Sequence, residues 1–177
     1  MSIERAEKSK RSEKTDRSDD RKLVWMQWWK ELQENRAGRA ELRRCGTVVE
    51  AAFCGPFHHL RYLMKNPVGR KLNHIGLIVA VLAHVDEDAP NDKSLAASMA
   101  QLEGEKAIVS DSRFRQILRC GDDDFDELLR DLVRVLRQLN GRAPIKQLGE
   151  DLWWWTDRTR RQWAIDYYER AIPERSN

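Results

Sequence analysis

The chain has 177 residues, which is enough for one well-buried core but too short for a large two-domain enzyme. Lys and Arg outnumber Asp and Glu by only 32 to 29, so the net charge of +3 does not by itself indicate a nucleic-acid-binding protein. Three scattered cysteines and the lack of a signal peptide predict reduced thiols and a cytoplasmic protein. The most apolar stretch, 72–85, is shorter than the roughly 20 residues that span a membrane, so we expect no membrane partner.

The first 21 residues differ in composition from the rest of the chain. After Ile3 they have almost no large apolar side chain, and they mix basic with acidic residues in near balance. Such a segment cannot bury enough apolar surface to offset the entropy that it loses on ordering. We therefore expect 1–21 to be a disordered charged tail, with a helix induced by a partner as the alternative, and 22–177 to be a single all-helical domain.

An arginine-rich segment, 35–45, follows the first strong helix signal. One helix face is marked at the i, i+3, i+4, i+7 spacing by Trp25, Trp28, Trp29 and Leu32. The next residues hold one acid, Glu41, and four arginines: Arg36, Arg39, Arg43 and Arg44. A fixed cluster of guanidinium groups suits phosphate or carboxylate ligands. The alternative is that these arginines only solvate the end of a helix or pair with carboxylates of the protein itself.

The middle of the chain reads as further helices and loops. Thr47 and Glu50 have the spacing of a capping box, and Pro56 suits the first turn of a helix. The stretch 72–85 is compatible with a strand, but its length and its apolar stripe favour a buried helix. Residues 86–92 predict a loop, and Ser94 caps a short helix through Leu102.

Two helices with basic faces follow. The first, 113–120, begins after a cap at Ser110 or Asp111 and carries arginines around an apolar face: Arg113, Arg115 and Arg119. The second, 125–139, has a leucine-rich face and ends before Gly141. On that helix a narrow sector opposite the leucines holds Arg130, Arg134 and Arg137.

The last part of the chain predicts helices at 151–155 and 158–171. Three consecutive tryptophans, 153–155, sweep about 200° of a helix, so at least one must face away from the core. Arg158 and Arg160 lie in the first turn of the last helix, where the helix dipole disfavours cations, and this suggests another role for them. The fold class is therefore all-α, a compact helical bundle of about six to nine helices, with two small lobes as the alternative arrangement.

Signals for catalysis are weak. His58 and His59 are adjacent and diverge on a helix, and common hydrolase, protease and phosphate-loop motifs are absent from the sequence. The enzyme alternative is a metal-dependent nuclease that uses His84, Asp86 and Asp88, but such isolated groups are more often structural. We expect no enzyme activity, no cofactor and no small-molecule substrate.

An ordered series of motifs runs along the chain from about residue 23 to 171. It consists of the Trp-x-x-Trp-Trp-x-x-Leu helix at 25–32, Arg-Ala-x-Leu-Arg-Arg at 39–44, Arg-x-Arg-x-Ile-Leu-Arg at 113–119, and the closing Leu-Trp-Trp-Trp and Arg-Arg-Gln-Trp-Ala-x-Asp-Tyr-Tyr at 152–155 and 160–168. This series resembles the CasB family, the small subunit of the type I-E CRISPR Cascade complex.

The resemblance implies a non-catalytic helical subunit that pairs with a second copy of itself. It would lie beside the backbone subunits that hold the CRISPR RNA and next to the large subunit, and bind DNA of the opened R-loop without reading its sequence. The residues carried over by matching position are Arg43, Arg44, Arg113, Arg119, Arg134 and Arg160. The pattern of the sequence alone adds Arg36, Arg39, Arg115 and Arg158. We expect the tryptophans to serve packing and subunit contacts more than base stacking. The alternative is a purely structural assembly subunit whose arginines and tryptophans meet other proteins.

Overall fold

The computed structural model describes residues 2–171, with side chains from residue 17 onward. Helices make up the architecture and the strands have two residues each, which confirms the predicted all-α class. Within the described residues there are ten helices, just above the predicted six to nine, and two of them, α3 and α6, have only four and five residues. In chain order the helices are α1 (Ser2–Glu34), α2 (Arg36–Arg44), α3 (Val48–Ala51), α4 (Gly55–Leu63), α5 (Lys71–Leu82), α6 (Leu95–Met99), α7 (Asp111–Arg119), α8 (Phe125–Gln138), α9 (Ile145–Trp153) and α10 (Asp157–Ala171).

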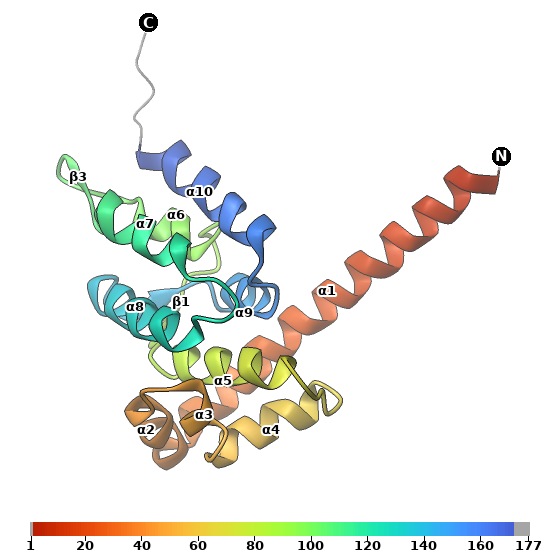
Figure 1. The fold of residues 1–177 in the computed structure, drawn as a ribbon, viewed down its shortest axis with the longest axis horizontal. Coiled ribbons are helices and arrows are strands. Elements are labelled where there is room, and N and C mark those ends of the chain that lie inside the picture. Colours follow the sequence, from red (N-terminus) through yellow and green to blue (C-terminus); the bar gives the residue numbers. More distant parts are fainter. Residues whose placement is uncertain (1, 172–177) are drawn as a thin grey trace, which may run out of the picture.

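Helix α1 begins at Ser2, although we expected residues 1–21 to be a disordered tail. Its first half extends away from the other helices (Figure 1). Residues 2–21 are rich in Glu, Lys and Arg and contain neither Gly nor Pro, so the helix anchored further along by the tryptophans can continue backward. Near the middle of α1, the side chains of Ser18 and Arg21 donate hydrogen bonds to Glu150 of α9. The division into a tail and one domain stays a prediction.

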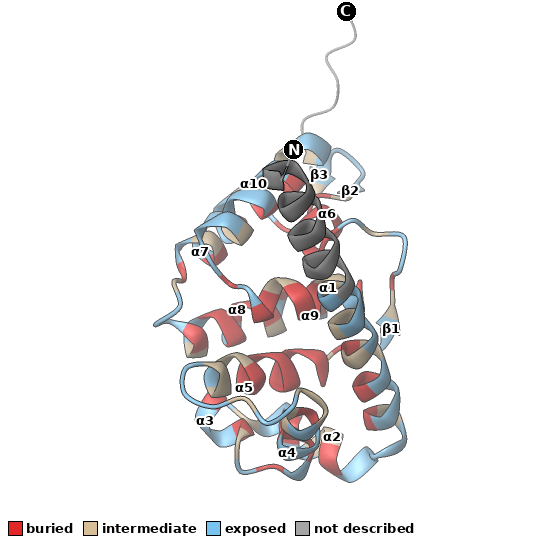
Figure 2. Cartoon of the chain, turned by 90° about the vertical axis from the view of Figure 1, so that its right-hand side faces the viewer, coloured by how far each residue is buried: buried red, intermediate tan, exposed pale blue. Residues whose placement is uncertain are grey.

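The central helix of the fold is α5. All residues from Ile75 to Leu82 are buried, as Figure 2 shows, which confirms a buried helix at 72–85. Helices α3, α4, α8 and α9 surround it. The predicted tryptophan face of α1 is also confirmed as buried, and Trp25 packs so closely on α9 that a Cβ at Gly149 would lie 2.5 Å from its Cγ. The absence of a side chain at Gly149 therefore sets how close α1 and α9 lie.

A second group of elements stands above α8 and α9 in Figure 1 and consists of α6, α7, α10 and the hairpin of β2 (Leu102–Glu103) and β3 (Lys106–Ala107). Phe114 of α7 stacks on Tyr167 of α10 with ring centroids 4.0 Å apart. The Tyr167 hydroxyl donates to the carbonyl of Val109. These residues belong to the same apolar cluster as α5, so the two parts of the molecule share a continuous core.

The short strands were not predicted. In the expected loop 86–92, β1 (Glu87–Asp88) pairs in parallel with β4 (Arg142–Ala143), and the hairpin includes Leu102, which we had placed at the end of a helix. Two-residue strands carry too little alternation to be visible in a sequence. Their effect is local, because β1 and β4 join the end of α5 to the start of α9.

Most predicted helix ends are confirmed by their caps. The side chains of Thr47, Ser94 and Ser110 accept hydrogen bonds from backbone N–H groups at the starts of α3, α6 and α7. The predicted helix at 151–155 was misplaced, since α9 begins at Ile145 and ends at Trp153. Pro144 directly precedes the first turn of α9, a position that proline tolerates.

The three cysteines are free, with Cys54 and Cys120 buried and Cys45 partly exposed. The fold brings the sulfur atoms of Cys45 and Cys54 to 3.7 Å from each other. Burial is the main cause that raises the pKa of the Cys54 thiol to about 12, which disfavours the reactive thiolate. Among residues 2–171, no helix combines the length and hydropathy of a membrane crossing.

Candidate nucleic-acid interface

Two arginines of α2 point into the protein. The Arg39 guanidinium donates to the carbonyls of Ala83 (3.1 Å) and Val85 (3.0 Å), just past the end of α5, and Arg43 donates to Ala83 at 2.7 Å. Both also pair with Asp86, at 2.6 and 2.9 Å. The last carbonyls of a helix have no partner within that helix, and the helix dipole favours cations there. Arg39 and Arg43 therefore cap the C-terminal end of α5.

Arg39 and Arg43 change the pKa of the Asp86 carboxyl group. Burial by itself raises the pKa of its carboxyl group, but hydrogen bonds from Arg39 and Arg43 outweigh burial and hold that pKa below its ordinary value. The Asp86 carboxylate is thus ionised at neutral pH and already shared between two arginines. For Arg39 and Arg43, the structure therefore shows the alternative reading of the sequence, in which the arginines pair with a carboxylate of the protein itself.

The other two arginines of α2 are different. Arg36 and Arg44 are exposed, and neither makes an ion pair or a side-chain hydrogen bond within residues 17–171. They lie at the first and last positions of α2, and in the described chain Asp86 pairs with Arg39 and Arg43 but with neither of these two. Their guanidinium groups are available to a ligand outside the chain.

Helix α7 presents a second set of available cations. Its apolar face, Phe114 and Ile117, is fully buried, whereas Arg113 and Arg119 are exposed and have no ion pair in the described part of the chain. Arg115 pairs with Asp111 at 2.9 Å and donates to the Tyr168 hydroxyl at 3.2 Å, both at the surface. Two of the three predicted arginines on this helix are therefore unpaired.

The predicted basic sector of α8 is exposed, opposite buried leucines. Arg134 pairs with Asp131 at 3.2 Å. Arg137, near the end of the helix, is close enough to His84 to act on its charge together with the arginines of α2. Burial, followed by Arg43, Arg137 and Arg39 in decreasing order, lowers the pKa of His84 to about 4, so the imidazole is neutral at neutral pH.

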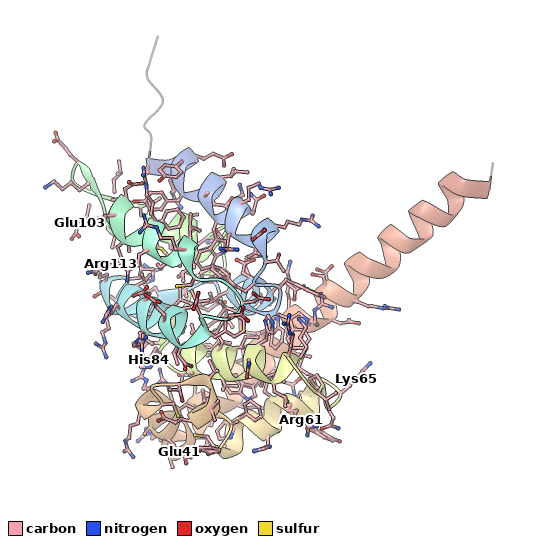
Figure 3. The ribbon with its side chains drawn as sticks, viewed as in Figure 1. Glu41, Arg61, Lys65, His84, Glu103 and Arg113 are labelled. Carbon is pink, nitrogen blue, oxygen red and sulfur yellow. The ribbon has the colours of Figure 1, made fainter. Side chains whose placement is uncertain are left out.

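The ends of α2, α5 and α8 thus bring arginines together around His84. In Figure 3, His84, which follows the end of α5, and Arg113 of α7 both lie toward the left of the view. Arg137 belongs to the stripe seen in the sequence, but its approach to His84 was missed. Its place near the end of α8, one turn before Gly141, was the only signal available.

The arginines of α10 also divide into two kinds. Arg158 is exposed and has no ion pair within the described residues. Arg160 is partly buried, donates to the Leu118 carbonyl at the end of α7 (3.0 Å) and pairs with Asp157. Arg160 therefore caps α7 as Arg39 and Arg43 cap α5, which explains a cation in the first turn of α10.

The groups of the nuclease alternative have structural partners. Asp86 is held by the two arginines, and Asp88 accepts a hydrogen bond from the Ile145 backbone N–H at 3.0 Å, at the start of α9. No cluster of three or more metal-binding side chains occurs in the part of the chain that the structure describes. A surface pocket of about 410 Å³ lies between α3 and α8, but its walls are acidic (Asp122–Asp124, Asp126 and Glu127), and such a surface repels phosphate.

Comparison with known proteins gives the family. The family model of CRISPR-associated protein Cse2 matches residues 38–168, well over half of the chain. The match spans α2 from its third residue to most of α10, so it covers nine of the ten predicted contact arginines, all except Arg36. No curated protein matches the chain. The expected resemblance to CasB is confirmed, and the chain belongs to the Cse2 (CasB) family of CRISPR-associated proteins, subunits of the Cascade complex.

Proposed function

We propose that this chain is the small, non-catalytic subunit of a type I-E Cascade complex in the cytoplasm, and that it binds DNA of the R-loop without reading its sequence. In this proposal it pairs with a second copy of itself and lies beside the subunits that carry the CRISPR RNA and beside the large subunit. The observation that carries the proposal is that five of the ten predicted contact arginines are exposed and have no ion pair among the described residues: Arg36, Arg44, Arg113, Arg119 and Arg158.

Exposed arginines without a carboxylate partner are suited to phosphate. A guanidinium fork matches two phosphate oxygens, and each contact releases counterions from the nucleic acid. The described elements offer no loop or helix of a base-reading module, so contacts of this kind would hold the backbone of any sequence. In the complex, guide pairing would select the sequence and the arginines would stabilise the opened strand.

The ten predicted contact residues do not contribute equally to this proposal. Arg39, Arg43 and Arg160 already donate to carbonyl groups. Arg115 and Arg134 each pair with a carboxylate, Asp111 and Asp131 respectively. A paired arginine must lose or share that interaction before it binds phosphate. We therefore assign the main DNA contacts to the five unpaired arginines and supporting charge to the five paired ones.

The test is a triple charge reversal, Arg44→Glu, Arg113→Glu and Arg119→Glu, in the assembled complex. We expect single-stranded DNA affinity to fall, and the slope of log affinity against log salt to lose about 2, at about 0.7 for each phosphate contact on a single strand. A matched control reverses three exposed lysines, Lys30, Lys65 and Lys146, and changes the net charge equally. Equal losses in both triple variants would contradict the proposal, because the arginine positions would then have no special role.

A purely structural assembly subunit is the second candidate, and exposed apolar side chains favour it. Phe53, Tyr62 and Val68 are each about 70% exposed or more, a common property of surfaces that meet other proteins. This alternative predicts that the triple arginine variant fails to enter the complex. Native mass spectrometry of the purified complex measures the amount of the subunit and separates the two candidates.

A further inference from the structure

One of the seven tryptophans stands apart in its exposure. Trp154 is 45% exposed, whereas the other six are at most 9% exposed. It lies directly after α9 and between the buried residues Trp153 and Trp155, which confirms that the three could not share one core. A large exposed aromatic side chain in a run of buried ones requires an explanation beyond packing.

The indole of Trp154 is held in a fixed orientation. Its Nε1–H donates to the buried carboxylate of Glu150 at 3.2 Å. Glu150 also accepts from the Arg21 Nε (3.1 Å) and from Ser18 (3.1 Å), both on α1. One buried carboxylate therefore fixes both the aromatic ring and a cation from another helix.

Two cations lie against this ring. The Lys71 Nζ at the start of α5 is 4.3 Å from the Trp154 ring centroid, and the Arg21 Cζ is 5.5 Å from it. Lys71 also donates to the carbonyl of Trp153 at 2.7 Å, which anchors it at the inner edge of the site. Burial and the neighbouring Arg21 lower the pKa of Lys71 to about 8, so it remains mostly protonated at neutral pH.

Glu150 makes an ion pair with Arg21, whereas Lys71 has no ion pair in the described chain. Arg158 adds a third cation: it is exposed, it lacks an ion pair in the described chain, and it precedes Thr159, whose hydroxyl donates to the Trp154 carbonyl. The corner formed by α1, α5 and the α9–α10 turn thus combines a partly exposed indole ring with two cations held against it, Arg21 and Lys71, and a third cation nearby, Arg158. This combination suits a ligand that carries both an aromatic ring and an anionic group.

We propose that Trp154 is a stacking site for an unpaired nucleobase of single-stranded DNA, with Arg21, Lys71 and Arg158 close to the adjoining phosphates. The inference rests on the proposed function and adds to it a named contact that needs an unpaired strand. Aromatic side chains next to a basic groove bind bases of any sequence, because every base has a stacking face. A paired base has no free face, so duplex DNA gains nothing from this site.

The burial of the other tryptophans makes the proposal directly measurable. In the purified full-length chain, stacking of a thymidine oligonucleotide would quench the fluorescence of Trp154 with little effect on the buried tryptophans. We expect quenching in the wild type and its loss in Trp154→Phe. Affinity for the single strand should fall about tenfold in Trp154→Ala and much less in Trp154→Phe, which keeps a stacking ring. Duplex affinity should stay unchanged in both variants.

Tyr62→Ala is the matched control, because Tyr62 is exposed on α4 and no cation stacks against its ring in the described part of the chain. It should leave single-strand affinity unchanged. Oligonucleotide binding without quenching, together with unchanged affinity in Trp154→Ala, would overturn the stacking site but leave the proposed function intact. Loss of Trp154→Ala from the complex with normal DNA binding would also overturn it, and would make Trp154 a protein contact. Failure of the wild type to bind DNA at all would overturn both proposals.

Discussion

Helices α2 and α7 carry similar arginine-rich sequences, yet their arginines are used differently. On α2, Arg39 and Arg43 turn inward to the carbonyls at the end of α5, whereas on α7, Arg113 and Arg119 remain exposed and make no ion pair within the described residues. The end of α7 receives its cation from elsewhere, from Arg160 of α10. The difference shows that an arginine beside the C-terminal end of another helix donates to the carbonyls of that helix end and is then less available to an outside ligand.

The largest expected effect is on stability, at Arg39. Arg39→Met would remove one of two donors from each of two carbonyls, because Ala83 keeps Arg43 and Val85 keeps Trp29, and it would also remove an ion pair with Asp86. We expect the free energy of unfolding to fall by about 2 kcal/mol. Urea unfolding followed by circular dichroism measures it. Arg36→Met on the same helix is the control and should stay within about 0.5 kcal/mol of the wild type. Equal losses in both variants would remove the distinction between capping and exposed arginines on α2.

Arg39→Met also allows the arginines of α2 and α7 to be compared in DNA binding. Well below its unfolding midpoint, Arg39→Met should keep most of its DNA affinity, whereas Arg113→Glu should lose affinity with little change in stability. Arg113 faces solvent, so its substitution changes mainly what the surface can bind. Electrophoretic mobility shifts at fixed salt compare the two. A larger loss of binding in Arg39→Met than in Arg113→Glu would contradict the assignment.

A smaller loss of stability is expected at Arg160. Arg160→Met removes the donor to the Leu118 carbonyl and should lower the free energy of unfolding by about 1–2 kcal/mol. The neighbouring Arg158→Met is the control, since Arg158 has no such contact in the described structure. Thermal unfolding of the two variants side by side gives the difference. A stable Arg160→Met variant would mean that α7 does not need the cap.

Asp86 adds a dependence on pH. Its pKa is lower in the folded state than its ordinary value of 3.8, so its ion pairs stabilise the protein above about pH 4, and that contribution is lost as the pH falls through the lowered pKa. Asp86→Asn should therefore lower the free energy of unfolding by less than about 1 kcal/mol near neutral pH, because the carboxyl group is more than half exposed. In strong acid the substitution should not change the free energy of unfolding. Urea unfolding midpoints of Asp86→Asn and the wild type, measured across a range of pH, test this dependence, with Asp123→Asn as the control. A loss of stability that is the same at every pH would contradict it.

The smallest effect is expected at Arg115. Its ion pair with Asp111 and its bond to the Tyr168 hydroxyl lie at the surface of α7, where solvent screens them. Arg115→Ala should leave the urea midpoint unchanged within error. A clear loss of stability would show that α7, like α2, relies on its own arginines for structure, and the comparison of the two helices would then fail.

The sequence alone determined most of the local structure. Caps at Thr47, Ser94 and Ser110, the tryptophan face of α1 and the leucine face of α8 depend on residues within a few positions of one another, so their spacing is sufficient. The ordered series of Trp, Leu and Arg motifs likewise indicated the family that the comparison confirmed. The helical course of residues 2–21 was missed, because composition measures the capacity for burial and not the continuation of a helix anchored at its other end.

Only the tertiary structure decided what each arginine does and which tryptophan is exposed. Arg39 meets the end of α5 more than forty residues away, Arg160 meets α7, and Trp154 is oriented by Glu150 together with α1. The residue type fixes the charge and the shape of a side chain, but its partner depends on which helix ends lie beside it. Those positions are set by the packing of the whole core, so no local pattern in the sequence contains them.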